Sequence, residues 1–105
     1  HYVFPTGSVE NSLITEGCEI AGEVRGSVLS AGVVVEEGAQ VVDSVIMPFA
    51  RIKKNAVVHR SIVAENAVIG ENARVGEGTG GIAVVGTNVQ LPEGAVLPAG
   101  EQAGN

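Results

Sequence analysis

The 105-residue chain is poor in aromatic residues, in charge and in cysteine. It contains one tyrosine, two phenylalanines and no tryptophan, and charged residues make up only 17% of it. Aliphatic residues and alanine therefore supply nearly all of the 45% hydrophobic content. A single cysteine excludes an internal disulfide framework, which fits a reducing compartment and predicts a cytoplasmic location.

Other absences narrow the class of protein further. No apolar run approaches the roughly 20 residues that span a bilayer, and no signal peptide is visible, so we expect no membrane partner. The net charge of −6 disfavours nucleic acid, because phosphate contacts need a basic surface. The first residue is His rather than Met, so we expect a chain that is processed or cut from a longer protein, with His1 as a tag remnant in the second case.

What the sequence does contain is a repeat of 17 residues, in three successive copies. They read SVLSAGVVVEEGAQVVD, SVIMPFARIKKNAVVHR and SIVAENAVIGENARVGE. Each copy holds three triplets in which an aliphatic residue follows a small residue by two positions. The aliphatic columns are Leu29, Ile46 and Val63; Val35, Ile52 and Ile69; and Val41, Val58 and Val75. Steps of six, six and five residues match neither a helix nor a long alternating strand, and indicate a repeat architecture.

The flanking sequence continues the repeat less regularly. We expect a lead-in at 1–11, regular coils at 12–77, a Gly-rich insert at 78–82, a last coil at 83–98 and a tail at 99–105. The copy before Ser27 is shortened to about fifteen residues around AGEVRG. Irregular end units are typical of stacked repeats.

Each triplet predicts one short strand, in which the first and third residues point to one side and the middle residue points to the other. Three such strands per unit, stacked on the next unit at about 4.8 Å, predict an all-β fold: a three-walled parallel β-helix of about five coils. The aliphatic columns face the axis, and Gly and Asn at two corners suit left-handed backbone. Phe49 interrupts one corner column, and Pro48 before it predicts a locally altered turn.

Charged residues also fall into columns. Glu37, Lys54 and Glu71 form one, and a second contains Asp43, Arg60 and Glu77. We expect oppositely charged neighbours in these columns to form ion pairs between coils, each worth about 0–1 kcal/mol.

The stretches NSLITEGCEIAGEV, DSVIMP, AVIGENARVG and GIAVVGTNVQLPEGAVLPAG, in this order, resemble the C-terminal domain of bacterial glucose-1-phosphate adenylyltransferase, or ADP-glucose pyrophosphorylase. The resemblance implies a left-handed, hexapeptide-repeat β-helix. It also implies a parent enzyme with an N-terminal catalytic domain, which uses Mg²⁺ to convert ATP and glucose 1-phosphate to ADP-glucose for glycogen synthesis. No catalytic residue, cofactor site or metal site is expected in this fragment.

The resemblance further implies a regulatory and assembly module, whose partners are its own catalytic domain and sister subunits of a tetramer. Plant members bind effectors through two lysines, but the aligned residues here are Glu65 and Thr87. Arg51, Lys53 and Lys54 are close enough in sequence to hold a sugar-phosphate or phosphate effector. The alternative is a solvated basic patch paired with acidic residues at 36–37.

One wall presents an aliphatic residue outward in every layer. These residues are Leu13, Val28, Val45 and Ile62, whereas the other two walls are mixed. A contiguous apolar stripe usually marks a contact surface, so we expect it to pack on the catalytic domain or a sister subunit. The alternative is ordinary surface valine in strands.

Three rival classes stay open. A hexapeptide-repeat acyltransferase would need His59 as its base, and a prism-shaped carbonic anhydrase would need three His ligands where the chain has two His in all. The third rival is a non-enzymatic scaffold. Cys18 falls in a corner column with Val33, Ala50 and Ala67, which predicts a packed thiol rather than a nucleophile.

Overall fold

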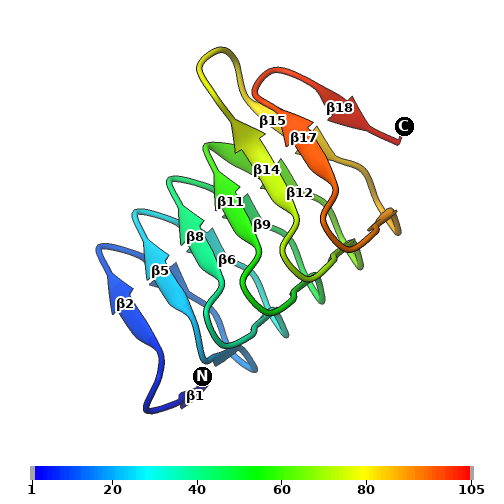
Figure 1. Cartoon of the computed structure of the whole chain (residues 1–105). Coiled ribbons are helices and arrows are strands. Elements are labelled where there is room, and N and C mark those ends of the chain that lie inside the picture. The colour runs from blue at the N-terminus through cyan, green and yellow to red at the C-terminus, as the bar shows by residue number, and fades with distance from the viewer. Residues whose placement is uncertain (1, 105) are drawn as a thin grey trace.

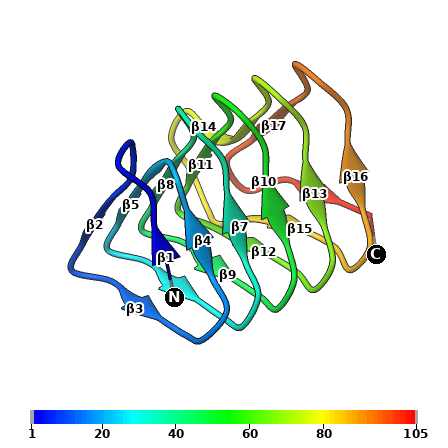
Figure 2. The ribbon, with the colours of Figure 1, turned by 90° about the horizontal axis from the view of Figure 1, so that it is seen from below.

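The computed structural model describes residues 2–104; His1 and Asn105, which belong to the expected lead-in and tail, lie outside the described residues. The described chain winds into a stack of coils measuring 31 × 23 × 22 Å. It consists of short strands that form three parallel sheets of six strands each, and each sheet is one wall of the stack. The expected three-walled parallel β-helix is confirmed (Figures 1 and 2).

The walls take every third strand in chain order. Wall 1 contains β1 (Tyr2–Val3), β4 (Glu19–Ile20), β7 (Val34–Val35), β10 (Arg51–Ile52), β13 (Val68–Ile69) and β16 (Gln90–Leu91). Wall 2 contains β2 (Ser8–Glu10), β5 (Glu23–Arg25), β8 (Gln40–Val42), β11 (Val57–His59), β14 (Arg74–Glu77) and β17 (Val96–Pro98). Wall 3 contains β3 (Leu13–Ile14), β6 (Val28–Leu29), β9 (Val45–Ile46), β12 (Ser61–Val63), β15 (Ala83–Val85) and β18 (Gln102–Ala103).

The register follows the repeat. Arg51 of β10 pairs with Val34 of β7 and with Val68 of β13, each 17 residues away. Glu19 of β4 pairs with Val34, 15 residues away, so the coil around AGEVRG is two residues short. The insert at 78–82 forms the loop between β14 and β15, which projects in Figure 1 from the corner between walls 2 and 3, beside the last coil.

The stack extends further at both ends than the sequence indicated. β1 and β2 lie within residues 1–11, where we expected a lead-in, and β18 lies within the expected tail. Each wall therefore has six strands, one more than the expected number of coils. The β2 triplet, with Gly7 and Val9, fits the small–X–aliphatic order and was overlooked, whereas the β18 triplet departs from it, with Glu101 in the small position and Ala103 in the aliphatic one.

The core is the column of inward-facing residues along the axis. Ile46, Ile52 and Val58, one from each wall of a single coil, are 0% exposed. The end coils are less covered, and Val9, Ile14, Leu91 and Leu97 are only half-buried. The interior is thus an uninterrupted aliphatic rod that is open at both ends.

The corners explain the Gly and Asn columns. At the corner from wall 3 to wall 1, Gly17, Gly32, Phe49, Asn66 and Asn88 all have a positive φ. The altered turn that Pro48 predicts is wrong, because the turn at Phe49 matches those of the neighbouring coils. Phe49 has a φ of 64°, and its N–H donates to the Ala31 carbonyl, just as the Asn66 N–H donates to the Pro48 carbonyl one coil later. Phe49 therefore adopts the left-handed backbone that its neighbours adopt at lower cost.

Candidate functional site

The corner from wall 2 to wall 3 contains a ladder of buried serines. Ser12, Ser27, Ser44 and Ser61 occupy equivalent positions in four successive coils. The Ser27 N–H donates to Ser12 Oγ at 3.0 Å, and the pattern repeats from Ser44 to Ser27 at 3.0 Å and from Ser61 to Ser44 at 3.1 Å. Each hydroxyl in turn donates to the carbonyl two residues earlier in its own coil, at 2.6–2.9 Å.

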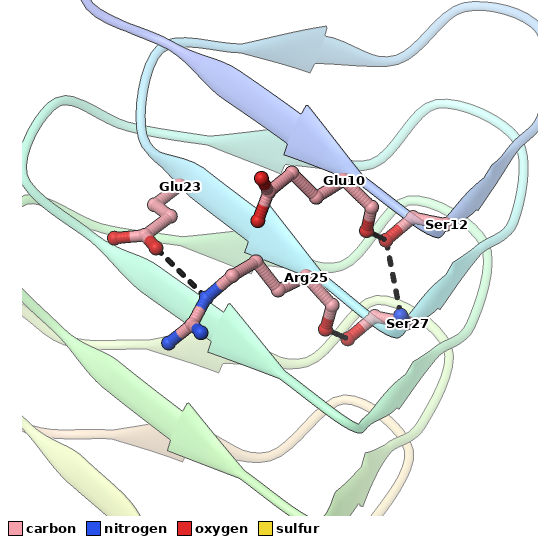
Figure 3. Close-up of polar contacts among 5 residues, drawn as sticks. All are labelled: Glu10, Ser12, Glu23, Arg25 and Ser27. Atoms are coloured by element: carbon pink, nitrogen blue, oxygen red, sulfur yellow. Dashed lines mark hydrogen bonds and ion pairs between the residues drawn. The ribbon is translucent and has the colours of Figure 1, made fainter.

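Figure 3 shows the first rung, in which Ser12 receives the Ser27 N–H and donates to the carbonyl of Glu10. Sequence reasoning placed these serines in a small-residue column but missed their hydrogen bonds. The available signal was the serine that opens each copy of the repeat, at Ser27, Ser44 and Ser61. The ladder is structural, because its hydroxyls already have partners and three of the four side chains are nearly inaccessible.

The outer face of wall 3 carries the predicted apolar stripe. Leu13, Val28 and Val45 are 67%, 39% and 41% exposed, and Ile62 is half-buried. β15 continues the stripe with half-buried Val84. The register aligns Leu13 with Val28, Val28 with Val45, Val45 with Ile62 and Ile62 with Val84, so the stripe is continuous over five coils.

A shallow hollow lies in the middle of this face. It has a volume of about 280 Å³ and is lined by Asp43, Val45, Arg60, Ser61, Ile62 and Ile82. Ile82, which is 58% exposed, comes from the insert before β15. The insert therefore adds an apolar side chain beside the stripe, which the sequence pattern did not reveal.

The structure brings two of the three candidate effector-binding cations together. Arg51 and Lys54 line a second hollow of about 310 Å³, whose other charged residues are Glu19, Glu36 and Glu37. Lys53 is not among its lining residues. The Arg51 guanidinium donates to Glu36 Oε2 at 2.8 Å, so an incoming anion would compete with a carboxylate already bound to it.

This hollow arises where the coil is two residues short. Ala21 and Gly22 make a narrow corner between β4 and β5, whereas the next coil spans the same corner with four residues, 36–39. Phe4 closes part of the other side, with its ring edge-on to Tyr2 at a centroid distance of 4.6 Å.

The expected ion pairs between coils are wrong for the two charge columns. Within residues 2–104 the ion pairs are Arg25–Glu23, Arg51–Glu36 and Arg74–Glu77. In two of these three pairs, both partners belong to the same strand: Arg25 and Glu23 lie in β5, as Figure 3 shows, and Arg74 and Glu77 lie in β14. A partner two or three residues away in the same strand needs less ordering of the side chains than a partner on the next coil, so local pairs prevail.

The remaining candidate residues have simpler surroundings. Cys18 is 1% exposed, and its thiol lies 3.1 Å from the Ser30 carbonyl, as expected for a packed residue. His59 is exposed and lines a hollow of about 250 Å³ with Val57, Arg74, Val75, Glu77 and Gly78. Within the described residues, no group of three or more His, Cys, Asp or Glu side chains is placed to hold a metal ion.

In residues 2–104 there is no helix of the length and apolarity that crossing a bilayer requires.

Comparison with known proteins gives the chain a family. The family described as GlmU-like, C-terminal hexapeptide matches residues 4–80. Proteins named glucose-1-phosphate adenylyltransferase from Bacillus thuringiensis (strain Al Hakam), Bacillus mycoides (strain KBAB4) and Bacillus anthracis are each 56% identical over 59 residues. The match covers 56% of this chain and 16% of each relative, so it spans only a small part of their length. No solved structure matches the chain. The family match extends over most of the chain and agrees with its hexapeptide prism, so this chain belongs to the GlmU-like, C-terminal hexapeptide family.

Proposed function

We propose that the chain is the regulatory and assembly module of a glucose-1-phosphate adenylyltransferase. The observation that carries this proposal is the 56% identity to enzymes of that name over 59 residues of a chain that folds as a stack of prism coils. In the proposed parent, a separate N-terminal domain makes ADP-glucose and pyrophosphate from ATP and glucose 1-phosphate with Mg²⁺. The product supplies cytoplasmic glycogen synthesis.

The stripe on wall 3 is the surface that this role needs. Leu13, Val28, Val45 and Ile62 form one apolar row, and a row of this kind on an otherwise acidic chain favours burial against another protein surface. In the parent enzyme the row would pack on the catalytic domain or on a sister subunit of the tetramer.

The parent enzyme offers a direct test of this surface. Val45→Lys places a charge in the middle of the row, and we expect it to dissociate the assembled enzyme or to loosen its domains. Val68→Lys, which changes a half-buried residue on the outer face of wall 1, is the matched control. Sedimentation velocity and ADP-glucose synthesis would be measured together. An unchanged assembly and unchanged synthesis in Val45→Lys would refute the role of the stripe.

The regulatory half of the proposal concerns the hollow beside the short corner. Arg51 and Lys54, with Lys53 at the adjoining corner, would bind a phosphate or sugar-phosphate effector by displacing Glu36 from Arg51. We expect inorganic phosphate to shift the backbone amide resonances of 51–54 in NMR titrations. Arg51→Ala should weaken this response, whereas Arg74→Ala, on wall 2, should preserve it. Equal responses in both variants would remove the hollow from consideration.

A hexapeptide-repeat acyltransferase is the second candidate function. It is favoured by the exposed His59 and the hollow that His59 shares with Arg74. Incubation of the chain with acetyl-CoA and amino-sugar acceptors should release CoA only if this alternative holds. Under the first proposal the chain alone neither releases CoA nor forms ADP-glucose.

A further inference from the structure

The outer face of wall 3 is self-complementary about its middle. The wall has six strands in the order β3, β6, β9, β12, β15 and β18, so its midpoint lies between β9 and β12. Asp43 directly precedes Ser44 and β9, and Arg60 directly precedes β12. The acid and the base therefore lie on the same edge of the wall, in the two adjacent coils that flank its centre.

Both charges are available to a partner. Asp43 and Arg60 are exposed, and neither takes part in the three ion pairs of the described residues. The Asp43 carboxylate lies over Gly26 of the preceding coil, away from Arg60: a side chain at Gly26 would collide with Asp43 Oδ1. The two residues thus share a column without neutralising each other.

An apolar surface lies beside this pair of charges. Val45 and Ile62 line the central hollow with Asp43 and Arg60, and Val28 and Val84 follow outward on either side. The row is therefore apolar at the four inner positions of the wall. A partner that covers it must present an apolar row flanked by one base and one acid in the opposite order.

We propose that this partner is a second copy of the same wall, with the two stacks running antiparallel. A two-fold axis parallel to the strands and passing between β9 and β12 places β9 opposite β12 of the second copy, and β6 opposite β15. Val45 then meets Ile62, and Val28 meets Val84. The same axis places Asp43 against Arg60 of the second copy twice, once on each side of the axis, as an isologous interface requires.

This inference rests on the assembly role proposed above and specifies its partner and geometry. No other overlay of the two walls about such an axis uses all six strands and also pairs both charges. One wall of a stack 31 Å long is a small interface, so we expect a weak dimer that depends on protein concentration.

The test uses two charge reversals in the 105-residue chain, Asp43→Arg and Arg60→Asp. Each reversal introduces the residue type that the adjoining coil already has at the equivalent corner position. Asp43 and Arg60 have similar backbones there, with φ values of 50° and 44°. Both variants should therefore fold, which far-UV circular dichroism would verify. In either variant alone, two like-charge pairs face each other across the axis, and the dimer dissociation constant should rise by roughly tenfold or more.

The decisive sample is an equimolar mixture of the two variants. In a mixed dimer, one chain carries arginine at both positions and the other carries aspartate at both, so both facing pairs are complementary again. Sedimentation equilibrium should show that the mixture dimerises about as well as the unmodified chain, whereas each variant alone dimerises roughly tenfold more weakly or not at all. A mixture that stays monomeric, variants that dimerise like the unmodified chain, or an unmodified chain that is monomeric throughout would each overturn the proposal. Because this readout involves no enzyme, it can fail while ADP-glucose synthesis by the parent still supports the proposed function.

Discussion

At the scale of single residues, the serine ladder connects adjacent coils at the corner from wall 2 to wall 3. Ser44 stands in its middle: its hydroxyl accepts the Ser61 N–H and donates to the Val42 carbonyl at 2.8 Å. Because the side chain is only 3% exposed, water cannot replace it. The column therefore stabilises the register between coils in addition to filling space.

Removal of this hydroxyl should destabilise the chain measurably. Ser44→Ala leaves the buried Ser61 N–H without its acceptor, and we expect it to lower the free energy of unfolding by about 1–3 kcal/mol. Urea unfolding followed by far-UV circular dichroism would measure the change. Ser8→Ala, at an exposed position of β2, should change it by less than about 0.5 kcal/mol. Equal effects of the two substitutions would mean that the ladder contributes nothing specific.

At the scale of residues, the sequence predicted the packing and also the pairing of the basic patch with residues 36–37, which Arg51 and Glu36 form, but the ion pairs expected within the two charge columns are wrong. The positions of Ile46, Ile52 and Val58 followed from the repeat, because an inward-facing residue in a narrow prism has one place to go. The charge columns did not predict ion pairs, because a long side chain at a corner can reach several partners. Arg74 bonds Glu77 within β14, and Arg51 reaches back to Glu36. Identical spacing in the sequence therefore does not determine which partner is bound.

At the scale of strands and corners, the main irregularity is the two-residue corner between β4 and β5. The following coil has four residues at this corner, and its backbone extends over Gly22. A Cβ atom at Gly22 would come within 2.5 Å of the Ala39 carbonyl oxygen and 2.7 Å of the Glu36 carbonyl oxygen. Only glycine fits there, because the neighbouring atoms belong to backbone and cannot swing away.

This close approach leads to a second prediction. Gly22→Ala must push two backbone segments apart, and we expect it to lower the free energy of unfolding by about 2 kcal/mol. Gly81→Ala is the matched control, since its Cβ would meet no atom closer than the Gly100 Cα at 3.7 Å. The control should change the same free energy by less than about 0.5 kcal/mol. Thermal and urea unfolding of both variants would decide the matter, and an unaffected Gly22→Ala would contradict the tight corner.

The sequence predicted the strands but not their full number. Triplets within 12–77 matched the repeat, and the structure has a strand at each, because all of them satisfy the aliphatic column and all but that of Val33 have a small residue or Cys18 two positions before it. The end strands β1 and β18 pair by backbone hydrogen bonds with coils that the repeat defines. A backbone ladder tolerates almost any side chain on the outer face, so such strands leave little trace in the sequence.

At the scale of the whole molecule, the period determined the three walls but not the hand of the coil, which came from the resemblance alone. The candidate site could likewise be predicted from the sequence only in part. The stripe from Leu13 to Ile62 followed from the alternation of the triplets. Ile82 did not, because an insert has no phase, and the hollow around Arg51 and Lys54 depends on two corners of unequal length.

Because each coil contacts only its neighbours, stability should depend on position along the stack. Val9 and Val58 face inward at equivalent positions of wall 2, in β2 and β11, and offer a comparison with identical chemistry. Val58 is 0% exposed between two coils, whereas Val9 is half-buried in the first coil and has a neighbour on one side only.

Val58→Ala leaves a cavity inside the rod, and we expect it to lower the free energy of unfolding by about 2 kcal/mol or more. Val9→Ala removes the same two methyl groups from a site that solvent already reaches, so its cost should be less than half as large. Urea unfolding of both variants, with equal m-values as a check on a common unfolding transition, measures the difference. Equal losses would mean that the first coil is covered as well as the middle of the stack, which would contradict an open end at β1–β3.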